Sequence, residues 1–220
     1  MNRLLIIAAT CFAFTSHMAT ANEFELSFYT GYQSAPHANI SGTDPGNSVN
    51  SNVDFTPAWE GRPFDMPPYY GFRGTWWQNS TFGVGLEFNH AKVYADEDEA
   101  AANGFSRLEF TDGLNVITVN AFRRWPEQFG DWTPYVGGGV GISVPHVDVE
   151  SAGGKTFEYQ LTGAAVMWAA GASYPINERW DGFVEYKGTY SQNTAELDNG
   201  GELDVDFVTN AINLGLTFNF

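Results

Sequence analysis

The stretch VTNAINLGLTFNF, residues 208–220, carries the pattern that decides the fold. Along it, apolar residues alternate with small or polar residues, with a single asparagine on the apolar side. Successive side chains of a β-strand point to opposite faces, so this stretch predicts a strand with one apolar and one polar face. The two faces are Val208, Asn210, Ile212, Leu214, Leu216, Phe218 and Phe220 on one side, and Thr209, Ala211, Asn213, Gly215, Thr217 and Asn219 on the other.

The composition agrees with a glycine-rich and aromatic-rich β protein. Of 220 residues, 43% are hydrophobic, 16% are aromatic and only 16% are charged, and 24 are glycine. The net charge of −16 argues against a nucleic-acid partner, because nucleic-acid binding requires clustered cations. No segment after residue 21 offers the run of roughly 18 apolar residues that a transmembrane helix needs.

Residues 1–21 are expected to be a secretory signal peptide. Arg3 supplies the positive start, residues 4–14 form an apolar run, and Ala19-Thr20-Ala21 has the small residues of a cleavage site. Cleavage after Ala21 would also remove Cys11, the only cysteine of the sequence. The sequence therefore predicts one exported domain, residues 22–220, without disulfide or thiol chemistry.

An exported chain can cross a membrane as a closed barrel, whose strands alternate lipid-facing and interior residues. The terminal Phe220, after alternating apolar residues, resembles the C-terminal signal of bacterial outer-membrane barrels. Short connections follow the second, fourth and sixth expected strands, and long ones follow the first, third, fifth and seventh. Five tryptophans lie near the short connections, as an outer aromatic girdle would place them: Trp76, Trp77, Trp125, Trp132 and Trp180. This predicts an all-β fold, an eight-stranded antiparallel transmembrane β-barrel of outer-membrane type, with its short turns in the periplasm. The expected strands cover roughly residues 23–33, 70–76, 82–89, 108–122, 135–144, 159–174, 183–190 and 208–220.

The interior of so narrow a barrel should be filled by its own side chains, which argues against a solute pore. Buried charges need partners, so the inward-facing charges are expected to form a neutralised network. They are Glu25, Arg73, Glu87, Glu185 and Lys187. The function is then expected at the outer rim, where the long loops lie.

Three histidines follow the first, third and fifth strands at their outer ends: His37, His90 and His146. Histidine acts as acid, base or metal ligand near neutral pH, so these three are candidate ligands of a divalent transition metal. They match no H-x-x-x-H or HEXXH motif, and separate roles for the three are the alternative. The candidate catalytic residues at the rim are His37, Glu60, Glu109, Asp112, His146 and Asp148.

An acyl hydrolase is a less favoured reading of these histidines. Outer-membrane deacylases often carry H-x-S on one strand, but Asn39, Lys92 and Asp148 occupy the third position here. A serine on another strand could still serve as nucleophile.

Several loop segments resemble the outer-membrane lipid A oxidases of rhizobia and their relatives. The resemblance extends over nearly all of residues 22–220. The matching segments are ELSFYTG (25–31), SAPH (34–37), SGTDPG (41–46), WEG (59–61), MPPYYG (66–71), LEFTDGLN (108–115) and VPHVD (144–148). The resemblance implies oxygen-dependent oxidation of the proximal glucosamine of lipid A to 2-aminogluconate, with release of hydrogen peroxide.

That activity implies lipopolysaccharide and the outer membrane as partners and molecular oxygen as co-substrate, and we expect a monomer. The sequence has no dinucleotide-binding pattern, so a rim-bound divalent metal is the simplest hypothesis for the redox centre. Candidate phosphate-binding cations are Arg62, Lys92, Arg107 and Lys155. Because the surrounding carboxylates would repel lipid A, divalent cations should bridge the two, and chelation should weaken binding. The alternative is a non-catalytic structural or adhesive barrel.

Overall fold

The computed structural model describes residues 23–220, apart from the side chains of Thr111 and Asp112. The expected signal peptide, residues 1–21, lies outside the described residues. No helix within the described part of the chain is long and apolar enough to span a membrane.

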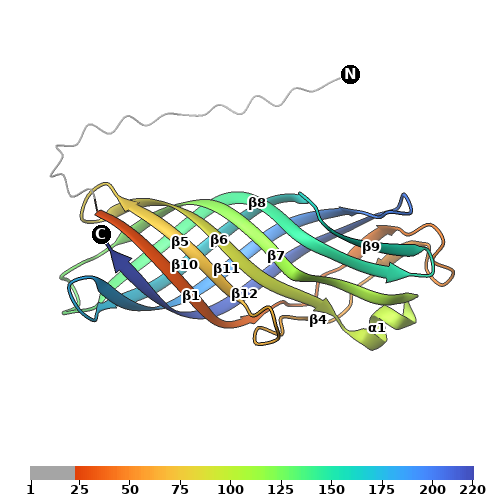
Figure 1. Cartoon of the computed structure of the whole chain (residues 1–220), viewed down its shortest axis with the longest axis horizontal. Helices are drawn as coiled ribbons and strands as arrows, with labels where there is room; N and C mark the ends of the chain where they lie inside the picture. The colour runs from red at the N-terminus through yellow and green to blue at the C-terminus, as the bar shows by residue number, and fades with distance from the viewer. Residues whose placement is uncertain (1–22) are drawn as a thin grey trace, which may run out of the picture.

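Eight long antiparallel strands form a closed ring, as the alternating sequence predicts (Figure 1). Pairing of the first strand with the last closes the ring, with Leu26 opposite Phe218. In order around the ring the strands are β1 (Glu23–Ser34), β5 (Tyr70–Trp77), β6 (Phe82–Ala95), β7 (Phe105–Arg124), β8 (Thr133–Ser151), β10 (Gly163–Pro175), β11 (Trp180–Glu196) and β12 (Glu202–Asn219).

The long connections are folded, which the sequence pattern did not predict. They contain β2 (Ile40–Thr43), β3 (Asn52–Phe55), β4 (Trp59–Glu60), α1 (Glu97–Ala102) and β9 (Gly154–Tyr159). The β2–β3 hairpin continues the sheet beside β12, and β9 pairs with β8 as a hairpin. The expectation of one strand over residues 159–174 is therefore wrong, because β9 ends at Tyr159 and β10 begins at Gly163.

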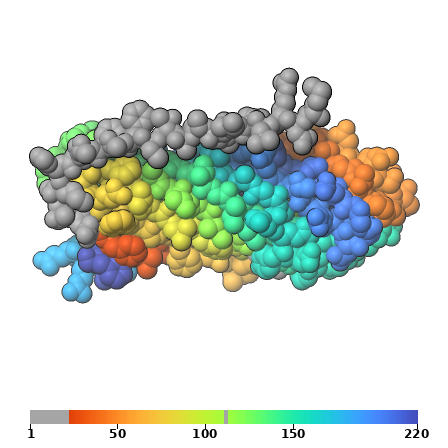
Figure 2. Space-filling view, turned by 90° about the horizontal axis from the view of Figure 1, so that it is seen from above, coloured from red at the N-terminus to blue at the C-terminus, as the bar shows by residue number. Residues whose placement is uncertain are grey.

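The long connections gather at one end of the barrel, and the start of β1 and the end of β12 lie at the other (Figures 1 and 2). In Figure 2 the first and last strands, red and dark blue, meet at one end, and the orange residues of the first long connection lie at the opposite end.

The polarity of the two faces inverts along β12. From Glu202 to Asp206 the outward residues are acidic and the inward ones, Leu203, Val205 and Phe207, are buried and apolar. From Val208 onward the outward residues are apolar except for Asn210, and most of them are exposed, whereas the inward residues include Thr209, Asn213 and Thr217. This inversion marks the level at which the wall passes from lipid to water, because lipid requires an apolar exterior.

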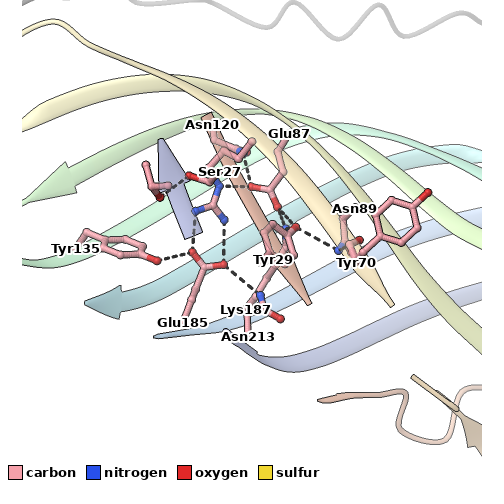
Figure 3. A network of polar contacts seen from close by, with 12 residues as sticks. Ser27, Tyr29, Tyr70, Glu87, Asn89, Asn120, Tyr135, Glu185, Lys187 and Asn213 are labelled. Carbon is pink, nitrogen blue, oxygen red and sulfur yellow. Dashed lines mark hydrogen bonds and ion pairs between the residues drawn. The ribbon is translucent and has the colours of Figure 1, made fainter. Parts of the chain in front are cut away.

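Charged side chains fill the interior at the level of the apolar exterior (Figure 3). Arg73 donates to Glu87 at 2.6 Å and to both carboxylate oxygens of Glu185 at 2.8 and 2.9 Å. Lys187 forms an ion pair with Glu87 and donates to the Tyr29 hydroxyl at 2.7 Å. The predicted interior network is thus found, with two cations facing two carboxylates.

Two interior assignments differ from expectation. Glu25 does not join the network but pairs with Arg124 at 2.7 Å, near the short turns. Trp76 and Trp77 were both expected in an outer aromatic girdle, yet neighbouring strand residues must point to opposite faces. Trp76 is exposed, whereas Trp77 lies inside, with the Arg124 guanidinium 3.9 Å from its ring centre.

A second, apolar core lies inside the end that carries the long connections. Trp59 packs against Phe110 and Phe207, with ring centres 6.3 and 4.9 Å away. Side chains tie neighbouring connections together above it, since Asn199 donates to Asp44 at 2.6 Å and Asn47 to the carbonyl of Asn103 at 3.1 Å. The long connections therefore form a packed cap on the barrel.

Candidate functional site

The outer wall of β6, the side facing away from the lumen, brings several predicted site residues into one line. Glu87 points into the interior network, so alternation places His90, Lys92 and Tyr94 on the outward face above it. The inward residue Val93 is fully buried in the cap core. The outward residues His90, Lys92 and Tyr94 lie directly above the lipid-facing part of β6.

Lys92 and Arg62 both approach the ring of Tyr94. Their charged groups lie 5.1 and 4.7 Å from its centre. Such cation–π contacts place two positive charges at one aromatic ring. Lys92 is fully buried under the first long connection and donates to the carbonyl oxygen of Asp65 at 2.8 Å. It is thus not the accessible phosphate-binding cation that the sequence suggested, because the connection covers it.

Beside Tyr94, charged side chains line a cleft of about 250 Å³ on the outer wall. Arg62 pairs with Glu60 at 2.7 Å and with Glu97 at 3.4 Å. Arg107 pairs with Glu109 at 3.2 Å and with Asp148 at 3.3 Å. We call these residues the wall cluster: Glu60, Arg62, Tyr94, Glu97, Arg107, Glu109 and Asp148.

The wall cluster joins five residues that the sequence singled out with two that it missed, Tyr94 and Glu97. Tyr94 follows His90 and Lys92 at a spacing of two, so the strand period could have found it.

The hydrogen bond with Glu60 raises the pKa of Arg62, which therefore stays charged throughout the physiological range. Asp148 is almost fully buried although it lies on the outward face.

His90 lies just below the wall cluster in a defined orientation. Its Nδ1 is 2.9 Å from Asn115 Oδ1, and its ring stacks on Tyr70 with centres 4.9 Å apart. Between β6 and β8 the strand β7 bulges around Thr111–Gly113, next to His90. Gly113 has φ of 113°, and a Cβ there would collide with the His90 ring. Asp112 belongs to this bulge, but its side chain lies outside the described part.

The three histidines are separate. His37 is exposed on the connection after β1, and His146 packs between Phe157 and Tyr159, with ring centres at 4.4 and 4.7 Å. No group of three His, Cys, Asp or Glu side chains among the described residues could hold a metal ion. The predicted ligand set His37, His90 and His146 is thus not assembled, because aromatic and amide partners orient His90 and His146 independently.

A family comparison decides the class of protein. Residues 7–220 match the model of the outer membrane protein beta-barrel domain. The chain belongs to this family. No curated protein matches it significantly.

Solved structures show the same fold for this outer membrane barrel. Neisserial surface protein A (NspA) is 13% identical with a TM-score of 0.51, covering 93% of this chain and 100% of its own. The outer membrane protein AlkL, solved in lipid bilayers, is 14% identical with a TM-score of 0.51 and 97% coverage of both chains. At these identities the likeness concerns the fold alone.

In an outer membrane barrel the short turns face the periplasm and the long loops face outward. The wall cluster and His90 lie towards the long connections, above the exposed apolar residues Phe72 and Leu86. They thus lie on the outward side of the wall near its outer end, where Arg62 and Arg107 are partly exposed and His90 and Asp148 are buried.

Proposed function

We propose that this outer membrane barrel is a lipid A oxidase that acts on lipid A from its outer wall. One observation carries the proposal: the wall cluster presents the charged side chains of Arg62 and Arg107 sideways, directly above the apolar belt, and the buried imidazole of His90 lies just below them. Lipid A in the outer leaflet would bring its phosphates and sugars to this level without leaving the membrane. The segments that resemble lipid A oxidases contribute residues to this wall, including Glu60, Glu109 and Asp148.

The reaction is the oxidation of the proximal glucosamine at its anomeric carbon. The C–H bond and the hydroxyl O–H bond break, and two electrons and two protons pass to molecular oxygen, which becomes hydrogen peroxide. The sugar becomes a lactone, and water opens it to 2-aminogluconate. The substrate must therefore carry a free anomeric hydroxyl group.

His90 is the residue that best fits the proton acceptor of this reaction. A hydrogen bond from Nδ1 to Asn115 Oδ1 would leave Nε2, which is buried in this structure, as the ring nitrogen that takes the proton. The stacked Tyr70 fixes the plane of the imidazole. The cations that would contact phosphate groups are Arg62 and Arg107, whose side chains are 31% and 47% exposed.

A divalent transition metal as redox centre stays a proposal without an assigned ligand set, since the described residues do not assemble one.

Divalent cations that bridge the protein and lipid A are proposed on a different ground, the charge of the wall cluster. Each wall arginine already faces two carboxylates, so the cluster carries a net negative charge. A divalent cation between these carboxylates and a lipid phosphate would relieve the repulsion.

The test is to incubate the folded barrel in air with lipid A that has a free anomeric hydroxyl, with and without a chelator. Oxidation should add the mass of one oxygen atom and release an equal amount of peroxide. In heavy-oxygen water the added oxygen should be heavy, because it enters when the lactone opens. Product formation that survives chelation would eliminate the metal but keep the oxidase.

A non-catalytic structural or adhesive barrel is the second candidate, and the packed cap favours it. The outward face of β12 beside the cap is an exposed acidic surface suited to contacts outside the cell, formed by Glu202, Asp204 and Asp206. Under this alternative, folded protein would leave lipid A unchanged even with added divalent metals. Substitutions in the wall cluster would then have no activity to remove.

A further inference from the structure

A chain of aromatic rings runs up the outer wall and ends at His90. The ring centres of Phe28 and Phe72 are 5.0 Å apart, those of Phe72 and Tyr70 are 5.7 Å apart, and those of Tyr70 and His90 are 4.9 Å apart. Phe88 joins the chain 6.1 Å from Tyr70. These residues come from the three adjacent strands β1, β5 and β6.

These aromatic rings lie on the lipid-facing surface. The side chains of Phe28 and Phe72 are 46% and 47% exposed, although both are fully apolar. Their inward neighbours, Ser27 and Arg73, are buried in the lumen. The exposed rings therefore contact the hydrocarbon of the bilayer rather than the interior of the protein.

The first long connection extends this aromatic surface upward. Phe64 is 72% exposed and lies 6.5 Å from Tyr32, which is itself 63% exposed on β1. Met66 is 84% exposed, and the intervening Asp65 accepts the hydrogen bond of Lys92. The segment that covers the cationic residue thus also projects apolar side chains towards the lipid.

The wall on the other side of the site has a different composition. Its exposed apolar residues on β7 and β8 are aliphatic: Ile117, Val119, Val136, Val140 and Ile142. His90 makes its ring contact with Tyr70, on the aromatic side. Arg62 of the wall cluster lies two residues before Phe64, which contacts Tyr32 on β1, so the cationic end of the first long connection adjoins the aromatic side.

We propose that this aromatic platform, formed by Phe28, Tyr32, Phe64, Tyr70, Phe72 and Phe88, binds the acyl chains of the glycolipid whose headgroup lies at Arg62. The identity of the lipid rests on the proposed function. Acyl chains are covalently attached to the headgroup, so a headgroup at Arg62 requires its chains to descend along an adjacent wall, and the exposed Phe64 lies two residues from Arg62. Rigid rings offer a large apolar contact area and lose little conformational entropy on binding.

The platform can be tested by binding, without turnover. Lipid A with a photoreactive group on an acyl chain is incorporated with the full-length mature barrel into bilayer discs and irradiated, and labelled peptides are mapped by mass spectrometry. A phospholipid with the same photoreactive chain is the matched probe. We expect lipid A to label β1, β5 and β6 several-fold more than β7 and β8, and the phospholipid to label all walls evenly.

Phe72→Leu keeps an apolar residue but removes the central ring, and we expect it to lower lipid A labelling of the platform several-fold. Val140→Ala, at an exposed position on the aliphatic wall, is the control and should change nothing. Even labelling by lipid A, or preferential labelling of β7–β8 or β10–β12, would overturn the proposal. Platform labelling without any oxidation would refute the oxidase and leave the lipid site standing.

Discussion

Arg73 on β5 and Glu185 on β11 form a bidentate ion pair across the lumen, with N–O distances of 2.8 and 2.9 Å. These strands are not neighbours in the ring, so the pair connects opposite parts of the wall. Both side chains are almost fully buried, and Glu87 and Lys187 complete the charge balance. The pair therefore stabilises the barrel and fills its interior.

Removing one partner should destabilise the barrel strongly. Glu185→Ala leaves Arg73 in a buried site with one carboxylate fewer, and breaking such a pair costs about 3–5 kcal/mol of unfolding free energy. Glu97→Ala, which removes an exposed partner of Arg62, should cost at most about 1 kcal/mol. Urea unfolding in detergent micelles, followed by tryptophan fluorescence, measures both. Equal losses for the two variants would contradict a structural role of the interior pair.

The barrel should not conduct solutes. The charged network fills the interior at the membrane level, and the apolar core with Trp59 and Phe207 closes the outer end. We expect no stable conductance steps when the protein is reconstituted into planar lipid bilayers. A reproducible ohmic pore formed by correctly folded protein would show that the interior opens.

Arg107 should contribute to the binding of lipid A. Arg107→Ala removes a cation next to Glu109 and Asp148, and we expect about tenfold weaker binding, or on the order of 1.4 kcal/mol. Lys155, which the sequence also suggested as a phosphate-binding cation, lies on β9 outside the wall cluster, and Lys155→Ala is therefore the matched control. The side chains of Arg107 and Lys155 are 47% and 49% exposed, and both pair with carboxylates. Titration of lipid A into barrel-containing micelles gives the affinities. Equal losses of lipid A affinity in the two variants would mean that binding depends on the total charge of the protein and not on the wall cluster.

His90 and His37 should differ in their effect on turnover. His90→Gln keeps a polar side chain beside Asn115 but removes the imidazole, so we expect peroxide release from lipid A to fall by at least about a hundredfold, as for loss of a proton acceptor. His37 is exposed outside the wall cluster, and His37→Gln should retain activity. Heat-modifiable migration on gels verifies that both variants fold. Normal turnover in His90→Gln would remove His90 from the mechanism.

Much of the barrel could be predicted because a strand has a period of two. The alternation at residues 208–220 predicted the inward and outward faces of β12 correctly. The charged residues that the same period places on inward faces of other strands form ion pairs in the lumen. The same rule explains one error, since Trp76 and Trp77 are adjacent and cannot both face lipid. A strict use of the period would have placed Trp77 inside.

The cap and the site could be predicted only in part. The two-residue strand β4 and the six-residue helix α1 are too short for a periodic signal, and they form because Trp59 and Ala100 pack into the cap core. Charged residue types were sufficient to nominate Arg62, Arg107 and Asp148. Their grouping on one wall depends on the register of β6, β7 and β8 and on the bulge at Gly113, which no local pattern encodes.

The most direct test of the central claim is mass spectrometry of lipid A after incubation with the purified, folded barrel in air. The account predicts a gain of one oxygen atom on the proximal sugar, peroxide in equal amount, and loss of both products in His90→Gln. Unchanged lipid A with a free anomeric hydroxyl, in the presence of folded protein, oxygen and added divalent metals, would contradict it and leave a non-catalytic barrel.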